Sequence, residues 1–303
     1  MQAAPRQGVR AGVGGNVGGA VADLIALTKP RIMALLLFTG FSAMIVALGR
    51  LPSWHLTMYT LVGLGFSTGG AAALNMWYDR DIDQIMGRTK GRPIPAGRIS
   101  PRVALAFGLL LEAAAVAILA LAVNGLTAGL AFAGFIYYVG IYTMWLKRRT
   151  PQNIVIGGGA GAFPPLVGWA AVTGHVGLPA VLMFLIIFLW TPPHFWSLAL
   201  YKNEDYVKAK VPMMPVVHGE RPTKVQSLIY GVLLLGSSLL LFETHVVGRV
   251  YLGAAMALGI GFVLILIRLL RETAPDLDWA KRTFRYSLIY LLAIFGFMLG
   301  NVR

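Results

Sequence analysis

Long apolar stretches, separated by short segments rich in charged residues, proline or glycine, run along most of the chain. Nine can be delimited, approximately at 31–49, 57–77, 103–122, 126–145, 153–173, 178–200, 226–242, 250–270 and 283–300. A helix needs about 20 mostly apolar residues to cross a bilayer. Helices also satisfy their own backbone hydrogen bonds, which hydrocarbon cannot do for them. The pattern predicts an all-α integral membrane protein with nine transmembrane helices.

Composition supports the same fold class. The chain has 303 residues, of which 57% are hydrophobic and 13% charged, against about 25% charged in an ordinary soluble domain. The absence of cysteine excludes disulfides, thiolate metal sites and covalent heme attachment through a Cys-x-x-Cys-His motif. Residues 1–20 are rich in Gly, Ala and Arg and lack an apolar core. We expect a disordered basic tail at 1–20 and a single transmembrane domain over 21–303.

The net charge of +14 is distributed unevenly between the two membrane faces. If the nine helices alternate in direction, 23 of the 26 Lys and Arg residues fall on one side, and only Arg50, Arg249 and Arg303 fall on the other. The positive-inside rule then places the N-terminus in the cytoplasm. The basic loops are explained by topology and by anionic headgroups. We therefore expect the lipid bilayer, and no nucleic acid, as a partner.

A stripe of polar side chains ends the second apolar stretch. Asn75, Asp79 and Asp83 are spaced i, i+4, i+8, which stacks them on one face of a helix, whereas Asp81 lies on the far side. No Lys or Arg on that stripe compensates the two carboxylates. Mg²⁺ commonly takes one or two carboxylates, with phosphate oxygens and water completing its octahedron. The stripe predicts a Mg²⁺-diphosphate site; the alternative is a solvated helix end whose carboxylates form local ion pairs, for example with Arg88.

Basic residues follow the stripe and recur in later loops on the same side. Arg88, Lys90 and Arg92 lie in a Gly- and Pro-rich loop that is expected to fold back and offer guanidinium groups to phosphate. In the fourth loop, Lys147 and Arg148 are candidates for binding phosphate or heme propionates. After the sixth stretch, Lys202, Glu204 and Asp205 would complete the diphosphate site if the second and sixth helices are neighbours.

Three further features lie inside the apolar stretches. Pro192 and Pro193 should kink the sixth helix, and His194 follows them, either as a ligand of heme iron or as a core residue bonded to a freed carbonyl. Glu112 lies in mid-membrane, where function and packing are equally open, so it is assigned no role. The glycines of 157–161 lack a following Gly-Lys-Ser/Thr and favour close helix packing over phosphate binding.

Three long strings occur in order on the predicted cytoplasmic side. They read DRDIDQIMGRTKGRPIPAGRIS, LKRRTPQNIVIGG and TPPHFWSLALYKNEDYVKAKVPMMPVVHG, and the first is preceded by the Asn-x₃-Asp-x₃-Asp stripe. From about Leu27 to its end the chain resembles the heme O synthases (protoheme IX farnesyltransferases) of the UbiA-type intramembrane prenyltransferase superfamily. The resemblance implies nine helices around a central cavity that holds Mg²⁺-bound farnesyl diphosphate. It assigns metal and diphosphate binding to Asn75, Asp79 and Asp83, and phosphate contacts to Arg88, Arg92, Lys147 and Lys202.

The resemblance also implies a reaction and a location. The farnesyl group would pass to a vinyl group of heme b, with addition of water, to give heme O and diphosphate for heme-copper oxidase biogenesis. The expected location is a bacterial inner membrane, with heme A synthase or oxidase assembly proteins as candidate partners. One departure is that Asp205 is followed four residues later by Ala209, where relatives acting on quinone precursors have a second aspartate. We expect Asp205 to act in catalysis together with Asn75, Asp79 and Asp83, whereas the number of Mg²⁺ ions stays open.

Two alternatives remain from the sequence. A prenyltransferase acting on a quinone or chlorophyll precursor would share the stripe, but should have the second acidic pair and lack the Pro-His-Phe-Trp run. A transporter or heme chaperone would explain broken helices, but it does not need a carboxylate stripe facing basic loops.

Overall fold

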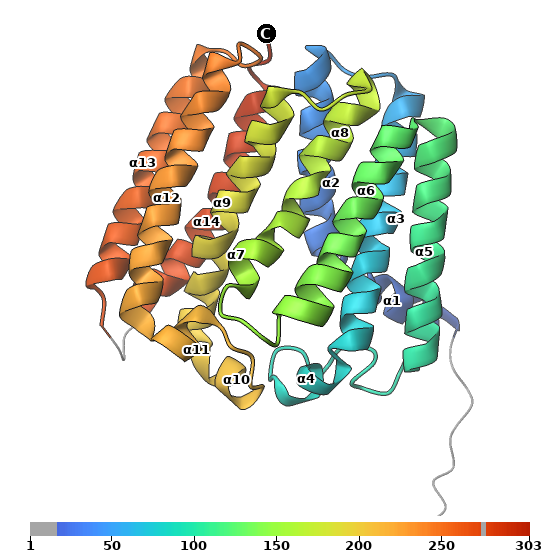
Figure 1. The fold of residues 1–303 in the computed structure, drawn as a ribbon, viewed down its shortest axis with the longest axis vertical. Coiled ribbons are helices and arrows are strands. Elements are labelled where there is room, and N and C mark those ends of the chain that lie inside the picture. The colour runs from blue at the N-terminus through green and yellow to red at the C-terminus, as the bar shows by residue number, and fades with distance from the viewer. Residues whose placement is uncertain (1–16, 274–276) are drawn as a thin grey trace, which may run out of the picture.

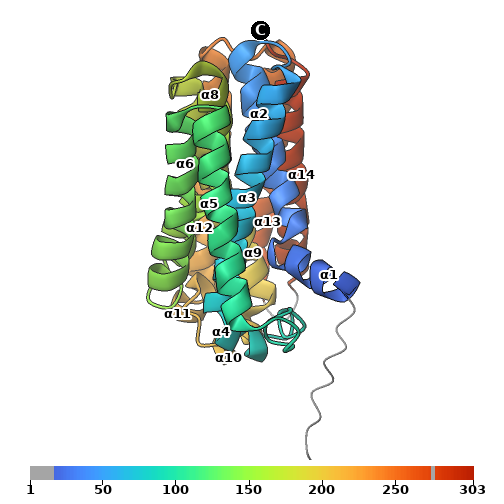
Figure 2. The same ribbon diagram turned by 90° about the vertical axis from the view of Figure 1, so that its right-hand side faces the viewer.

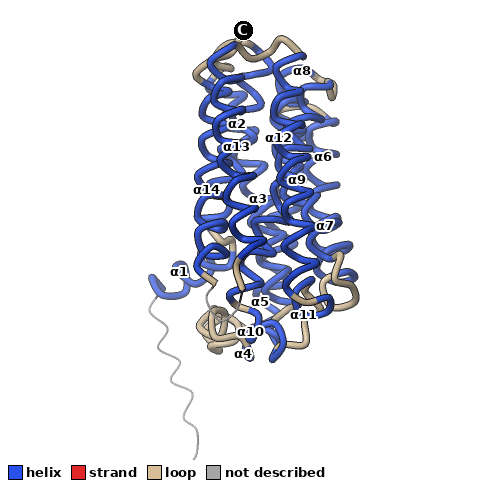
Figure 3. Tube along the Cα trace, turned by 90° about the vertical axis from the view of Figure 1, so that its left-hand side faces the viewer, coloured by secondary structure: helices blue, strands red, loops and turns tan. Residues whose placement is uncertain are grey.

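A computed structural model of the protein describes residues 17–273 and 277–303, and all its regular elements there are helices (Figures 1 and 3). In chain order they are α1 (Val17–Leu27), α2 (Pro30–Leu48), α3 (Trp54–Tyr78), α4 (Arg80–Ile85), α5 (Pro101–Ala122), α6 (Gly125–Ile136), the π-helix η1 (Tyr137–Leu146), α7 (Asn153–Gly157), the 3₁₀ helix η2 (Gly158–Ala162), α8 (Phe163–Thr173), α9 (Leu178–Tyr201), α10 (Asn203–Lys208), α11 (Met214–His218), α12 (Glu220–Glu243), α13 (Arg249–Arg271) and α14 (Asp278–Leu299). The all-α prediction is confirmed.

Eight helical segments of the described chain are long and apolar enough to cross a membrane. They are α2, α5, α6 with η1, α7 with η2 and α8, α9, α12, α13 and α14. The remaining predicted span, 57–77, lies within α3, which has 25 residues but whose apolar character is diluted by Gly, Ser and Thr. A helix of that length rises about 37 Å, enough to cross. Eight spans are therefore supported, and α3 as a ninth stays a prediction.

The long helices form a closed arrangement of two groups (Figures 1 and 2). In the first group α3 packs between α2 and α5, α5 packs on α6, and α8 packs on both α6 and α2. In the second group α9, α12, α13 and α14 pack around a large apolar core that includes Tyr251, Phe262, Tyr290 and Phe295. Contacts of α8 with α9, and of α14 with α2, join the two groups.

Glycines set the closest helix approaches. A Cβ on Gly168 of α8 would collide with the backbone carbonyl of Gly40 on α2. In the run 157–161, a Cβ on Gly157 would overlap the Tyr142 ring, and one on Gly158 would lie 2.7 Å from Thr191 Cγ2. The close-packing interpretation of this run is confirmed at these positions, although Gly161 has nothing within 4 Å.

The two ends of the bundle differ in chemistry. At one end, uppermost in Figure 1, Gly248 N–H donates to Asn301 O at 2.8 Å, and Gly49 lies against Arg303. Arg50, Arg249 and Arg303 are therefore at this end. The other end carries α1, α4, α10 and α11 (Figure 1), and we call it the basic end because the loops rich in Lys and Arg lie there. Which end faces the cytoplasm stays a prediction.

The N-terminal helix α1 lies across the bundle axis at the basic end (Figure 2). It begins at Val17, so the last four residues of the predicted tail, 17–20, are helical. An ion pair between Asp23 and Arg98 Nε, 2.9 Å long, and burial of Leu27 hold it against the bundle. Residues 1–16 of the predicted tail lie outside the described residues.

Candidate functional site

The polar stripe lies where α3 gives way to α4 at the basic end. Asp79 ends α3 with φ −84° and ψ 9°, yet the helical hydrogen bonds continue, from Asp79 N to Asn75 O at 2.9 Å and from Asp83 N to Asp79 O at 2.8 Å. The i, i+4, i+8 stacking therefore survives the junction. Asn75, Asp79 and Asp83 are only 3%, 0% and 2% exposed. These are buried groups and not a solvated helix end.

Cations from other elements compensate the two carboxylates. Lys147, at the end of η1, forms an ion pair with Oδ2 of Asp79, and Arg92 Nη1 lies 2.6 Å from Oδ2 of Asp83. Arg148 Nη2 lies 3.5 Å from Asp79 Oδ1, while its guanidinium makes two 2.7 Å hydrogen bonds to Asp81. Those bonds hold the pKa of the Asp81 carboxyl below its usual value. The ion pairs considered as an alternative do form, but with Lys147 and Arg92 instead of Arg88.

Lys29 belongs to this cluster, although its place in the sequence predicted only a contribution to membrane topology. Its Nζ donates to Asn75 Oδ1 at 2.7 Å and lies 3.5 Å from the Tyr138 hydroxyl. Burial, and then the charges of Arg92 and Lys147, lower the pKa of Lys29 to about 7. The one sequence signal was its place directly before Pro30, at the start of α2. Lys29 also has a φ of 52°, in the left-handed region.

The Asn75 amide is held on both sides. Its Oδ1 accepts from Lys29, and its Nδ2 donates to Asp79 Oδ2 at 2.8 Å and to Thr143 Oγ1 at 3.1 Å. These partners come from α2's first turn, from the stripe itself and from η1. The side chain is thereby fixed in one orientation.

The stripe fits a divalent cation only when phosphate supplies further ligands. Within 17–273 and 277–303, no group of three His, Cys, Asp or Glu side chains could hold a metal by itself. Asp79 Oδ1 is nevertheless buried without a hydrogen-bond partner. An oxygen without a hydrogen bond, on a stripe that also carries a second carboxylate and an amide, gives the donor set expected for Mg²⁺ that is also bound by phosphate. The neighbouring cations Lys147, Arg92 and Arg148 suit the same polyanion.

The π-helix η1 replaces the regular helix expected over 137–145. It ends with Lys147 N–H donating to Tyr142 O, five residues back, at 2.9 Å. Such wide turns are rare and frequently occur at functional sites. Here η1 provides Thr143 to the stripe, and Lys147 directly follows its last residue. Tyr138 and Tyr142, whose ring centres lie 5.5 Å apart, are partly exposed, as Lys29 is. Partial exposure of these three side chains is consistent with an internal space beside them. The central cavity itself stays a prediction.

The second polar run approaches the loop that follows α4. The Asp205 carboxylate lies 3.9 Å from the position of a Cβ on Gly87. Below α9, the cluster of Ile82, Met86, Trp196 and Tyr206 joins α4 to α9 and α10. Among the described residues Arg88 and Lys202 are exposed and form no ion pair. Their part in phosphate binding stays a prediction, as does that of Asp205.

His194 lies between α9 and α14, in an aromatic seat formed by Trp190 and Phe284. Its Nδ1 is 2.6 Å from Ser287 Oγ, and its ring stacks on Trp190 and on Phe284. Trp190 Nε1 donates to the Ser287 carbonyl at 2.7 Å. His194 therefore bonds a serine hydroxyl on α14 and not a backbone carbonyl freed by the prolines, which was the alternative from the sequence. The helix α9 runs continuously through Pro192 and Pro193.

Glu112 is buried, 5% exposed, and neither carboxyl oxygen has a hydrogen-bond partner in the described part of the chain. It lies where α5 approaches α3 closely, because a Cβ on Gly70 would be 3.3 Å from Glu112 N.

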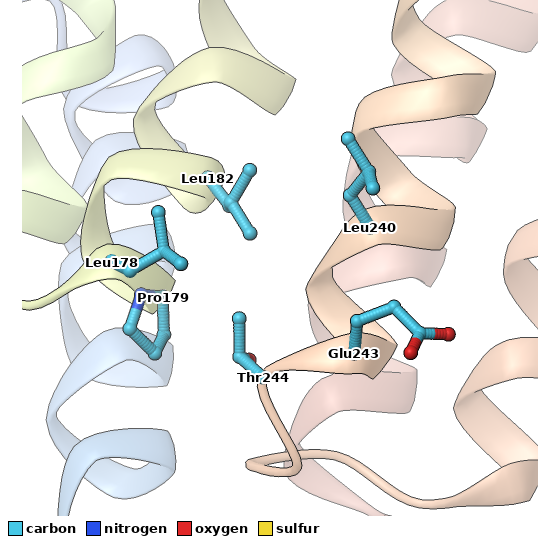
Figure 4. A pocket seen from close by; sticks show the side chains of 6 residues that line it. All are labelled: Leu178, Pro179, Leu182, Leu240, Glu243 and Thr244. Atoms are coloured by element: carbon cyan, nitrogen blue, oxygen red, sulfur yellow. The ribbon is translucent and has the colours of Figure 1, made fainter.

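A groove at the other end of the bundle is unrelated to this chemistry (Figure 4). Leu178, Pro179 and Leu182 of α9 face Leu240 and Thr244 across it. The Glu243 carboxylate points away from the α9 side chains in Figure 4. Most of the side chains that line the groove are apolar, unlike those of the stripe.

Known proteins resemble this chain over nearly its whole length. The UbiA prenyltransferase family model matches residues 36–289. A Protoheme IX farnesyltransferase of Symbiobacterium thermophilum is 58% identical, covering 94% of this chain and 95% of that protein. The protein of the same name from Acidiphilium cryptum is 50% identical, covering 92% and 90%.

Solved structures share the fold at lower identity. A digeranylgeranylglyceryl phosphate synthase aligns with a TM-score of 0.77 and 19% identity, covering 93% of this chain and 99% of that one. A UbiA homologue from Archaeoglobus fulgidus, bound to GPP and Mg²⁺, aligns with a TM-score of 0.63 and 18% identity, covering 92% and 99%. With a buried Asn-Asp-Asp stripe in an all-helical bundle and a family match across most of its length, this chain belongs to the UbiA prenyltransferase family.

Proposed function

We propose that this protein is a Mg²⁺-dependent protoheme IX farnesyltransferase, which transfers the farnesyl group of farnesyl diphosphate to a vinyl group of heme b and thereby makes heme O. The observation that carries the proposal is the buried Asn75-Asp79-Asp83 stripe, surrounded by cations at one end of an apolar bundle. The choice of heme as acceptor is supported by relatives of that name, up to 58% identical over nearly the whole chain.

Diphosphate binding is assigned to the cations around the stripe. Lys147 and Arg92 lie against the carboxylates, and Lys29 lies against the Asn75 amide. Asn75, Asp79 and Asp83 would hold Mg²⁺, a role supported by the Archaeoglobus fulgidus relative that binds GPP and Mg²⁺. When bound, the ion supplies positive charge next to the departing diphosphate. Arg88, Arg148 and Lys202 are assigned to the outer part of the same anion site, and Asp205 to its α10 side.

The reaction moves one carbon group and one water molecule. The bond between farnesyl C1 and its phosphate oxygen breaks, and the electron pair leaves with diphosphate. A vinyl carbon of heme b bonds to C1, which leaves a cation on the carbon next to the porphyrin ring. Water adds there and releases a proton, giving a hydroxyalkyl side chain. The protein's cations stabilise the leaving group, and its apolar walls keep water from the allylic cation before the new bond forms.

Heme b is assigned to the aromatic seat of His194, with iron as the atom bound. Trp190 and Phe284 give this seat flat apolar surfaces. The propionates of heme are negatively charged and would point toward Arg148 and the other cations of the basic end. We place this end in the cytoplasm and the protein in a bacterial inner membrane, with heme A synthase or oxidase assembly proteins as recipients of the product.

The test is incubation of the purified protein with heme b, farnesyl diphosphate and Mg²⁺, with and without EDTA, followed by mass spectrometry of the extracted heme. A hydroxyethylfarnesyl adduct that depends on Mg²⁺ is the expected result. Failure to modify heme, together with prenylation of a quinone precursor, would retain the diphosphate site and overturn the acceptor. An adduct formed equally in EDTA would overturn the metal assignment.

A further inference from the structure

The imidazole of His194 is fixed in plane by two aromatic rings. The Trp190 ring centre lies 4.3 Å away at an interplanar angle of 17°, and that of Phe284 lies 4.6 Å away at 23°. Since the ring is sandwiched, only its edge atoms remain to make polar contacts. The two nitrogens therefore decide what His194 can bind.

The hydroxyl of Ser287 determines which nitrogen carries the proton. Ser287 Oγ donates its single hydrogen to the Phe284 carbonyl at 2.7 Å. A hydroxyl has one hydrogen and two lone pairs, so toward His194 Nδ1, 2.6 Å away, Ser287 can only accept. Nδ1 must then be protonated, and Nε2 carries the lone pair.

The other nitrogen is left open. Among residues 17–273 and 277–303 no group hydrogen-bonds Nε2. Nε2 is also not among the fully buried polar atoms without a partner, so it keeps some accessible surface. His194 is 6% exposed. Nε2 has a lone pair that no described group uses, and a polar atom without a partner inside an apolar bundle costs free energy. Nε2 is therefore available to bind a ligand.

We propose that Ser287 is a positioning residue, which holds His194 as the Nδ1–H tautomer so that Nε2 presents its lone pair to the iron of heme b. The inference rests on the proposed function, since heme b is the acceptor there. Metal-binding histidines generally donate their second N–H to a fixed acceptor, which sets the tautomer and the ring orientation. Here that acceptor is a serine 93 residues away on another helix.

The depth of His194 agrees with a heme lying beside the diphosphate site. His194 precedes Tyr201, the last residue of α9, by seven positions, or about 10 Å along a helix. The iron would therefore lie two turns inside the bundle from the basic end. Trp190, one turn deeper, donates to the backbone carbonyl of Ser287, whose hydroxyl bonds His194, so α14 holds both side chains.

The experiment compares four full-length variants in detergent: Ser287→Ala, Ser287→Thr, His194→Ala and, as the matched control, Ser227→Ala. Ser227 is also a buried serine on a helix, and its hydroxyl donates to the Thr223 carbonyl, away from His194. Heme b is titrated into each protein, its affinity is taken from the Soret absorbance, and the iron ligation is read from the ferric EPR spectrum. Binding of Mg²⁺ with inorganic diphosphate monitors the integrity of the other site.

We expect Ser287→Ala to weaken heme binding on the order of 10-fold and to alter the histidine-ligated spectrum in the same direction as His194→Ala. Ser287→Thr, which keeps the hydroxyl, and Ser227→Ala should match the parent protein. Diphosphate binding should be equal in all four.

Two results would overturn the inference. One is a parent-like spectrum and affinity in Ser287→Ala; the other is a parent-like spectrum in His194→Ala, because then the iron has no ligand at His194. Failure of the proposed function is seen separately, as the absence of farnesylated heme from the parent protein even though heme b binds it through His194.

Discussion

Lys29 Nζ donates to Asn75 Oδ1 at 2.7 Å, and this bond ties the first turn of α2 to the polar stripe of α3. The two residues are 46 positions apart; Lys29 directly precedes α2, and Asn75 belongs to α3. Lys29 thereby brings an amine to the stripe, which has no basic residue of its own.

The pKa of Lys29 predicts how stability varies with pH. Burial, followed by the charges of Arg92 and Lys147, lowers this pKa from 10.5 to about 7 in the folded protein. Between those values the unfolded chain holds a proton that the folded chain has lost, so Lys29 makes the free energy of unfolding rise with pH. The Tm of the parent protein minus that of Lys29→Met should therefore increase from pH 7 to pH 9. The exposed Lys90→Met is the control, and a constant difference would contradict the prediction.

Removing the charge of either stripe carboxylate should abolish transfer. Asp79→Asn and Asp83→Asn keep the size of each side chain but lose a ligand for the cation, and we expect turnover to fall by about 100-fold or more, the scale for losing one group that stabilises developing charge. Both proteins should stay folded, since Lys147 and Arg92 retain 18% and 23% exposure and can be hydrated.

The matched control for the stripe is Asp81→Asn, because that carboxylate is 61% exposed and faces Arg148. It should keep at least most of the parent activity. Turnover is measured as diphosphate released from farnesyl diphosphate in the presence of heme b. Normal turnover in both Asp79→Asn and Asp83→Asn would refute the metal site.

The approach of α2 to α8 predicts a large effect from one methyl group. Gly168→Ala forces a Cβ into the Gly40 carbonyl, which is backbone and cannot rotate away, so the two helices must separate. We expect a loss of about 1–3 kcal/mol, typical of overpacking, measured as a lower Tm in detergent. Gly236→Ala, where nothing lies within 4 Å, should be neutral or slightly stabilising. Equal Tm values in the two variants would argue against the packing.

Replacing the buried Glu112 by an apolar residue should stabilise the folded protein. Its buried carboxyl has no hydrogen-bond partner among the described residues, so replacing it by the apolar Glu112→Leu removes an uncompensated polar group. The Tm should rise, by an amount corresponding to about 1–3 kcal/mol, with unchanged transferase activity. Glu112→Gln stays polar and should give a smaller change. A drop in activity with Glu112→Leu would instead give this carboxyl a function.

Local patterns in the sequence were sufficient for the helices and for the stripe itself. Eight of the predicted spans meet length and composition requirements, and the spacing of Asn75, Asp79 and Asp83 fixes them on one face because the helical bonds continue through Asp79. Both inferences depend only on neighbours within two or three turns. The same is true of the glycines near 157, whose small size favoured close packing.

The partners of these residues could not be predicted, because they come from distant parts of the chain. Lys147 reaches Asp79 across 68 residues, and Ser287 reaches His194 across 93. Basic loop residues look alike in sequence, so nothing distinguished Arg92, which binds Asp83, from Arg88, which is exposed. The π-helix was missed for a related reason, since 137–146 has the composition of an ordinary apolar helix.

The π-helix η1 makes the alignment of Thr143 and Lys147 with the polar stripe depend on the number of residues in this segment. A single residue inserted into or deleted from 137–146 would turn the following chain by about 100° relative to the preceding helix. Thr143 faces Asn75 and Lys147 faces Asp79 only in the present register. Substitutions along the lipid-facing side of this segment leave that register intact, whereas a change of one residue in its length removes both contacts together. The segment is therefore tolerant in composition but intolerant in length.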